Sequence, residues 1–144
     1  MPRITLEYPD ESFTFSTSMT VRTSDLNHGA HLGFDQMVSL IGHARYLFLR
    51  SLGIDELGVP GIVVGDLAVV YRAEAFRDDE LTFEVGVAEL NKYGGDIAYR
   101  VTRVSDGALV VTAKTGVVFI DTTAERPTGP PPAFVAAFEA PREP

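Results

Sequence analysis

The chain has 144 residues, a formal net charge of −8 and no cysteine. This length fits a single domain that can bury a core, and 45% hydrophobic with 22% charged residues is ordinary for a folded protein. The acidic balance argues against nucleic acid as the main partner, because phosphate binding needs a basic face. Without cysteine there is no disulfide framework and no thiolate chemistry.

The sequence predicts neither a signal peptide nor a membrane span. No long apolar run occurs in the first residues, MPRITLEYPDESF. The most apolar windows, 62–71 and 109–120, are interrupted by Asp66 and Lys114, and both are shorter than the roughly 20 residues that a membrane-spanning helix needs. A cytoplasmic protein is therefore the default prediction.

The first predicted elements are a strand, a loop and a long helix. Residues 13–23 alternate between apolar and small polar side chains, which is typical of a strand. The following SDLNHGAHLG favours an irregular loop. A helix is expected over 34–52, and Gly53 suits the left-handed residue that ends it. Because its apolar residues occupy more than one stripe, we expect the domain to bury this helix.

The rest of the chain reads as strands followed by a tail. We expect one long strand or a bent pair over 62–76, then strands over 81–90, around 97–101 and over 109–121. Gly94-Gly95 predicts a turn, and Ser105-Asp106-Gly107 predicts a hairpin. The prediction is one domain over 1–125 and a Pro-rich tail over 126–144 with a possible short helix at 132–139.

This order predicts an α+β fold of the hot-dog kind, an antiparallel sheet wrapped around one long central helix. A small sheet cannot bury such a helix from one side unless the sheet curls around it or a second copy covers the rest. The exposed edge strand of such a sheet also invites pairing with another copy.

The loop and helix SDLNHGAHLGFDQMVSLIGHARYLFLRSLG carry a resemblance to a known family. The segment resembles the 4-hydroxybenzoyl-CoA thioesterase-like family of hot-dog proteins, and with GIVVGDLAVVYRAEAFRDDEL and VVTAKTGVVFID the resemblance covers most of residues 13–121. It implies hydrolysis of an acyl-CoA or acyl-carrier thioester, with no cofactor apart from the coenzyme A of the substrate. The matching residues are Asp25, His31, Ala44, Arg45, Phe48, Leu49, Leu52 and Gly53.

The chain departs from the family pattern at its second loop carboxylate, which is Asn27 here, and at the helix glutamates, which are Gly42 and His43. An amide cannot accept a proton as a general base, so Asn27 cannot inherit the carboxylate's role. The loop looks closer to a subgroup with the pattern Asp-x-Asn-x-Gly-x-His-Leu-Gly-x-Asp. The residues with counterparts in that pattern are Asn27, Gly29, His31, Leu32, Gly33 and Asp35.

Thioester hydrolysis needs an activated water and donors for the developing oxyanion. We expect the donors among the backbone amides near Gly33 and Phe34, at the positive end of the helix dipole. Asp35 is the candidate for orienting or deprotonating water, and the alternative is that it only complements the helix N-terminus.

Asn27 and His31 complete the predicted catalytic set. Asn27 can donate to the thioester or fix the water, or it can form an ordinary Asx turn. His31 can act as acid or base near neutral pH, or it can brace the loop. His28 is expected to face solvent, and His43 to be a satisfied buried histidine. The spacing of these histidines fits no zinc pattern, so the sequence predicts no metal.

Two further positions are candidates for substrate binding. Asp66 interrupts an apolar strand and is a second carboxylate candidate, unless it simply faces outward. Arg72, like Arg77, Lys92 and Arg100, can reach coenzyme A phosphates across a subunit boundary, or it can be a solvated surface charge. The predicted substrate-binding residues are Gly33, Phe34, Asp66, Tyr71 and Arg72.

The sequence therefore predicts a thioesterase that is a homodimer or a dimer of dimers, with its site between protomers. Two alternatives stay open at this point. One is a hot-dog hydratase or dehydratase acting on 2-enoyl or 3-hydroxyacyl thioesters. The other is an acyl-thioester binding protein without activity, which the amide at Asn27 motivates. The acyl group, and the choice between coenzyme A and a carrier protein, are left open.

Overall fold

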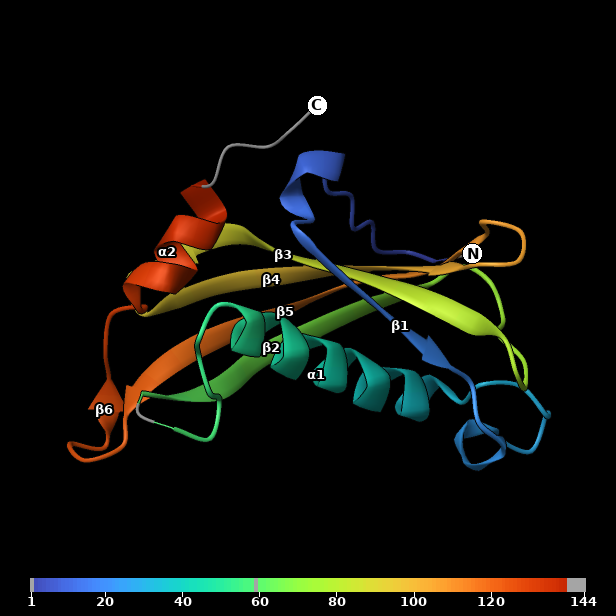
Figure 1. The fold of residues 1–144 in the computed structure, drawn as a ribbon, viewed down its shortest axis with the longest axis horizontal. Coiled ribbons are helices and arrows are strands. Elements are labelled where there is room, and N and C mark those ends of the chain that lie inside the picture. Colours follow the sequence, from blue (N-terminus) through green and yellow to red (C-terminus); the bar gives the residue numbers. More distant parts are fainter. Residues whose placement is uncertain (1, 59, 140–144) are drawn as a thin grey trace.

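A curled antiparallel sheet and one long helix make up the fold in a computed structural model that describes residues 2–58 and 60–139. The strand order is β1-β3-β4-β5-β2, and β6 pairs with β5 (Figure 1). The predicted α+β hot-dog arrangement is confirmed. In chain order the elements are η1 (Asp10–Ser12), β1 (Phe15–Thr20), η2 (Thr23–Asp25), α1 (Phe34–Ser51), β2 (Gly61–Tyr71), β3 (Glu80–Asn91), β4 (Gly94–Arg103), β5 (Leu109–Asp121), β6 (Arg126–Pro127) and α2 (Pro132–Glu139).

The core lies between α1 and one face of the sheet. Strand alternation directs one set of side chains to this inner face, where Phe83 and Tyr99 are fully buried. α1 contributes a stripe at helical spacing, which includes Ile41 and Phe48. Its end is where the sequence predicts it, because Gly53 has a φ of 78°.

The other side of α1 is less covered than the sequence predicts. Phe34 is 72% exposed, and His43 is exposed rather than buried and stacks on Tyr46 with ring centroids 6.1 Å apart. The expectation that the domain buries more than one stripe of the helix is therefore not met within one chain. The physical reason is that the sheet curls over one side of α1 only.

Gly94 and Gly95 do not form the predicted turn. The chain turns at Lys92 and Tyr93, and both glycines lie in β4. A Cβ on Gly94 would lie 2.0 Å from the carbonyl oxygen of Val117, and one on Gly95 would lie 2.1 Å from that of Glu89. These glycines thus permit the close approach of neighbouring strands.

Both ends of the described chain pack onto the sheet. η1 lies over Gly86 in β3, and Asp10 forms an ion pair with Arg100 on β4. In the tail, Phe134 of α2 is fully buried, and its ring centroid lies 5.0 Å from that of Phe119. α2 therefore shares the core of the domain, and residues 140–144 of the predicted tail lie outside the described residues. Neither α1 nor α2 is long and apolar enough for a membrane-spanning helix within the described chain.

Gly86→Ala should destabilise the protein, because the added Cβ would lie 1.6 Å from the backbone oxygen of Ser12 and would push η1 away from β3. We expect a loss of about 1–3 kcal/mol in the free energy of unfolding, measured by chemical denaturation. Gly42→Ala is the control, since no atom lies within 4 Å of its Cβ position in α1 and it should stabilise the protein by about 1 kcal/mol. Equal stability of the two variants would contradict this packing.

Candidate active site

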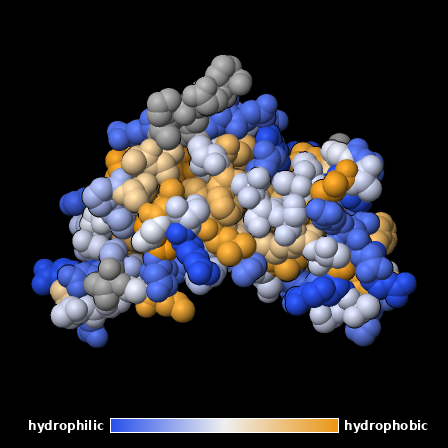
Figure 2. Space-filling model, in the orientation of Figure 1, coloured by the Kyte–Doolittle hydropathy of each residue, from blue (hydrophilic) through white to orange (hydrophobic). Residues whose placement is uncertain are grey.

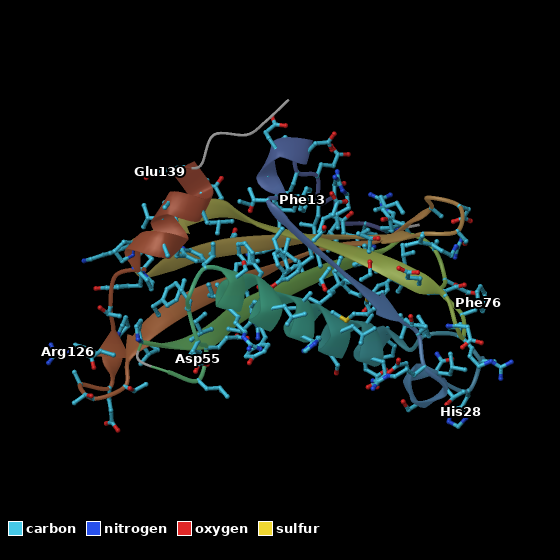
Figure 3. All side chains as sticks on the ribbon, in the orientation of Figure 1. Phe13, His28, Asp55, Phe76, Arg126 and Glu139 are labelled. Atoms are coloured by element: carbon cyan, nitrogen blue, oxygen red, sulfur yellow. The ribbon has the colours of Figure 1, made fainter. Side chains whose placement is uncertain are left out.

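The loop between η2 and α1 is a small hairpin joined to the segment that follows β2. Leu26 pairs with Leu32, and the amide of Asn27 donates to the carbonyl of His31 at 2.9 Å. His31 in turn pairs with Phe76, and the amide of Leu32 donates to the carbonyl of Ala75 at 2.8 Å. These backbone contacts bring two segments far apart in sequence into register. Figure 3 shows His28 and Phe76 at the end of the molecule where α1 begins.

Asp25 fixes this loop to the helix. Its side chain is fully buried and accepts hydrogen bonds from the Arg22 guanidinium at 3.0 Å, the Arg22 amide at 2.8 Å and the Gln36 side chain at 3.2 Å. The hydrogen bond from Arg22 holds the pKa of the Asp25 carboxyl below its usual value. The backbone carbonyl of Asp25 also accepts from Gly33, so one residue connects η2, the loop and the start of α1.

A cavity of about 360 Å³ opens between the loop, the start of α1 and the end of β2. Its apolar lining comes from the loop, α1, the segment after β2 and β5, and consists of Leu32, Met37, Ala73, Ala75 and Val110. Two aromatic side chains, Phe34 and Tyr71, line it as well, and its polar lining consists of Asn27, His31, Arg72 and Glu74. An apolar cavity with a few converging polar groups is the usual form of a small-molecule site.

The structure brings most of the predicted site residues together. Asn27, His31, Phe34, Tyr71 and Arg72 all line the cavity.

Asp66 does not line the cavity. Its side chain is 62% exposed and binds Lys114 at 2.6 Å and the amide of Gly116 at 3.0 Å. The hydrogen bond from Lys114 lowers the pKa of the Asp66 carboxyl. A bulge at this point of β2, between Val64 and Asp66, shifts the alternation of the strand. The structure therefore does not bring Asp66 to the site.

Asp35 lies beside the cavity and outside its lining. Its Oδ1 accepts from the amide of Gln36 at 3.0 Å, and a Cβ on Gly33 would lie 2.6 Å from this oxygen. Gly33 therefore leaves room for the Asp35 side chain, and Gly33 itself is not among the lining residues. The hydroxyl of Tyr71 donates to the carbonyl of Phe34 at 2.7 Å; burial raises the pKa of Tyr71, and the charge of Asp35 adds to this effect. The role of Asp35 as a base stays a prediction.

The backbone donors at the start of α1 differ in part from those expected. The amide of Gly33 is not free, because it donates to the carbonyl of Asp25 at 3.1 Å. The amides of Phe34 and Asp35 donate to no residue in the described chain. Such unpaired amides carry the positive end of the helix dipole, so they suit an oxygen that gains negative charge.

Asn27 forms an Asx turn and keeps a donor for a ligand. Its Oδ1 accepts from the amide of Gly29 at 2.9 Å. The side-chain nitrogen, Nδ2, donates to no described residue, and the side chain lines the cavity. Both interpretations of Asn27 from the sequence are thus compatible with one conformation.

His31 is held by three contacts. Its Nδ1 lies 3.3 Å from the carbonyl oxygen of Leu32, its Nε2 lies 3.8 Å from Oε1 of Glu74, and its ring meets that of Phe76 edge-on at 6.4 Å. His28 is exposed and is not part of the cavity lining, as expected for a solvent-facing loop residue.

Glu74 is the residue that the sequence analysis missed. It is the only acidic side chain of this cavity among the described residues. The signal available was a lone carboxylate in the small-residue stretch Ala73-Glu74-Ala75 directly after an apolar strand. No group of three or more His, Asp or Glu side chains in the described ranges could hold a metal ion.

Comparisons with known proteins agree with the hot-dog class defined by the fold. The sequence profile of the thioesterase-like superfamily matches residues 21–138, and the chain belongs to this family. Membership supports thioester hydrolysis as the reaction, the activity predicted from the loop and helix. No curated protein matches the sequence.

Solved structures share the fold at low sequence identity. A 1,4-dihydroxy-2-naphthoyl-CoA thioesterase from Synechocystis is 16% identical with a TM-score of 0.79, and the match covers 90% of this chain and 98% of that one. A thioesterase superfamily protein from Jannaschia sp. CCS1 is 18% identical with a TM-score of 0.81, covering 89% and 82%. A Staphylococcus aureus protein in complex with CoA is 16% identical with a TM-score of 0.78, covering 87% and 81%.

Asp25→Asn should destabilise the protein by about 1–3 kcal/mol at neutral pH, because it removes the charge from a buried carboxyl that accepts hydrogen bonds from Arg22. The pKa of Asp25 is lower in the folded than in the unfolded protein, so its contribution is present above the unfolded pKa and is lost as pH falls through the folded pKa. The stability gap between variant and wild type should therefore narrow in acid, as measured by urea unfolding at several pH values. The control is Glu80→Gln, an exposed carboxylate on β3 with no ion pair among the described residues. A gap that stays constant down to low pH would contradict this role.

Proposed function

We propose that this protein hydrolyses an acyl-CoA thioester to a free acid and coenzyme A in the cavity beside the start of α1. The observation that carries the proposal is the polar edge of an apolar cavity, where Asn27 and His31 lie next to the unpaired amide of Phe34. The thioester is both the reacting group and the boundary between an apolar acyl chain and a polar carrier. A cavity with this division of apolar and polar lining matches that chemistry.

The acyl group enters the apolar part of the cavity, against the buried side chains of Met37 and Val110. The thioester carbonyl oxygen then accepts hydrogen bonds from the side-chain nitrogen of Asn27 and the backbone amide of Phe34. These hydrogen bonds strengthen as negative charge develops on the oxygen, which lowers the barrier to attack by water. Coenzyme A extends outward past Arg72, an exposed cation with no ion pair among the described residues.

His31 is the proposed general base. A carbonyl oxygen can only accept a hydrogen bond, so the contact with Leu32 places the imidazole proton on Nδ1. Nε2 then keeps its lone pair and can take a proton from water. Asp35 takes part in this proposal as a charge beside the site: it accepts from the Gln36 amide in the first turn of α1, and its charge adds to the raised pKa of Tyr71.

The names of the structural neighbours support coenzyme A as the carrier. The Synechocystis protein is a thioesterase for an aromatic acyl-CoA, and the Staphylococcus aureus protein is in complex with CoA. A CoA substrate is also compatible with the predicted cytoplasmic location, which stays a prediction.

We also infer that the protein is a homodimer, or a dimer of dimers, that pairs along β2. Among the described residues β2 pairs with β5 only, so its other edge offers free backbone donors and acceptors. Its side chains Val63, Val64 and Leu67 are 41–52% exposed, and Phe34 of α1, which lines the cavity with Tyr71 at the end of β2, is 72% exposed. Figure 2 shows apolar side chains in the middle of the face that contains α1, with hydrophilic residues towards both ends. A second copy on this edge would cover apolar surface that a single chain leaves in water.

Asn27→Ala should lower kcat for acyl-CoA hydrolysis by about 100-fold, because it removes one donor to the oxyanion. The measurement is release of free thiol from a panel of aliphatic and aromatic acyl-CoAs. His28→Ala, an exposed change in the same loop, is the control and should keep wild-type activity.

Other results with the same acyl-CoA panel would identify one of the two alternative functions, a binding protein or a hydratase. Saturable binding of acyl-CoA without thiol release would indicate a binding protein, and an absorbance change with crotonyl-CoA would indicate a hydratase. Either result would overturn the hydrolysis proposal.

Leu67→Lys should shift the protein towards a monomer, because it places a charge on the edge strand next to a pairing partner. Light scattering coupled to size-exclusion chromatography measures the mass. Leu57→Lys, which changes an 89% exposed side chain in the loop after α1, is the matched control and should not change the mass. A monomeric wild type would overturn the dimer.

A further inference from the structure

We propose that Glu74 is a positioning residue for His31 and supplies the carboxylate that the loop lost at Asn27; this inference rests on the proposed hydrolysis. Glu74 lies in the segment between β2 and β3, not in the loop or on the helix. Its Oε1 is 3.8 Å from Nε2 of His31, and both side chains line the same cavity.

The backbone fixes this pairing. His31 pairs with Phe76, and the amide of Leu32 donates to the carbonyl of Ala75. These contacts hold the two segments in register next to Glu74. Its approach to His31 is thus set by antiparallel pairing between distant segments.

The separation of 3.8 Å suits an ion pair better than a direct hydrogen bond. In the resting state Nε2 and the carboxylate are both acceptors, because Nδ1 holds the proton against Leu32. A water molecule that donates one hydrogen to each would satisfy both groups. Once Nε2 is protonated, the carboxylate stabilises the imidazolium through its charge.

This arrangement gives a balanced reaction. The water oxygen bonds to the thioester carbon as Nε2 of His31 takes one proton, and the carbonyl electrons move to the oxygen held by Asn27 and the Phe34 amide. When the carbonyl re-forms, the carbon–sulfur bond breaks and the thiolate takes the proton from Nε2. The products are the carboxylic acid and the thiol. Glu74 stays ionised throughout and stabilises the imidazolium formed between the two proton transfers.

Few other charged groups of the described residues share the cavity lining with His31. Arg72 is in the same lining and opposes the effect of Glu74, and Tyr71 is the remaining titratable group there. Asp35 lies outside the lining, next to Tyr71. Since Glu74 is 62% exposed, solvent screens the pair until substrate covers it.

The test is Glu74→Gln, which keeps the shape of the side chain and removes its charge. We expect kcat/KM for the best acyl-CoA to fall about tenfold, because the imidazolium loses a stabilising charge in the partly exposed site. Because the variant removes a charge 3.8 Å from Nε2 of His31, the pH dependence of kcat/KM should differ from that of the wild type. His31→Gln should lose about 100-fold or more. Asp78→Asn, an exposed change in the same segment, is the matched control.

A second measurement does not depend on activity. The NMR signals of the His31 ring in the protein without substrate should change in Glu74→Gln, and they should change less in Asp35→Asn. If Glu74→Gln leaves both the ring signals and the pH dependence of kcat/KM unchanged, while the wild type releases thiol, the pairing is overturned. Changed ring signals without any thiol release in the wild type would support the pairing and overturn the proposed hydrolysis instead.

Discussion

The buried carboxylate of Asp25 is the constraint on which the site depends. Its charge would be costly to bury alone, and four hydrogen bonds from Arg22 and Gln36, at 2.8, 3.0, 3.2 and 3.2 Å, offset this cost. The same residue accepts the amide of Gly33 through its backbone. The loop therefore reaches α1 in one geometry, beside the cavity that Phe34 lines.

The site joins two parts of the chain that the sheet brings together. One is the hairpin 26–32, which supplies Asn27 and His31. The other is the segment after β2, which supplies Arg72 and Glu74. The backbone pairing between them fixes distances that neither segment fixes alone. In this arrangement an asparagine can replace a loop carboxylate, because a different segment can present an acidic side chain to the same histidine.

Patterns in the sequence predicted the bounds of helices and strands well, and the contacts between strands less well. The strand 109–121 and the tail helix 132–139 have the predicted bounds, since alternation and helical spacing are local properties. Gly94 and Gly95 look like a turn in sequence, yet they serve close contact with Val117 and Glu89 on other strands. A glycine pair has the same sequence in a turn and in a strand, and only the contacts with neighbouring strands distinguish the two structures.

The sequence by itself determined the order of strands and helix, the end of α1 at Gly53 and the loop that carries Asn27 and His31. The tertiary structure alone decided which carboxylate meets the histidine. Asp66 and Glu74 are both acidic residues in or just after β2, but a bulge and the alternation of the strand leave Asp66 paired with Lys114, while antiparallel pairing brings Glu74 to His31. Sequence spacing does not encode this choice, because side-chain direction depends on register across the sheet.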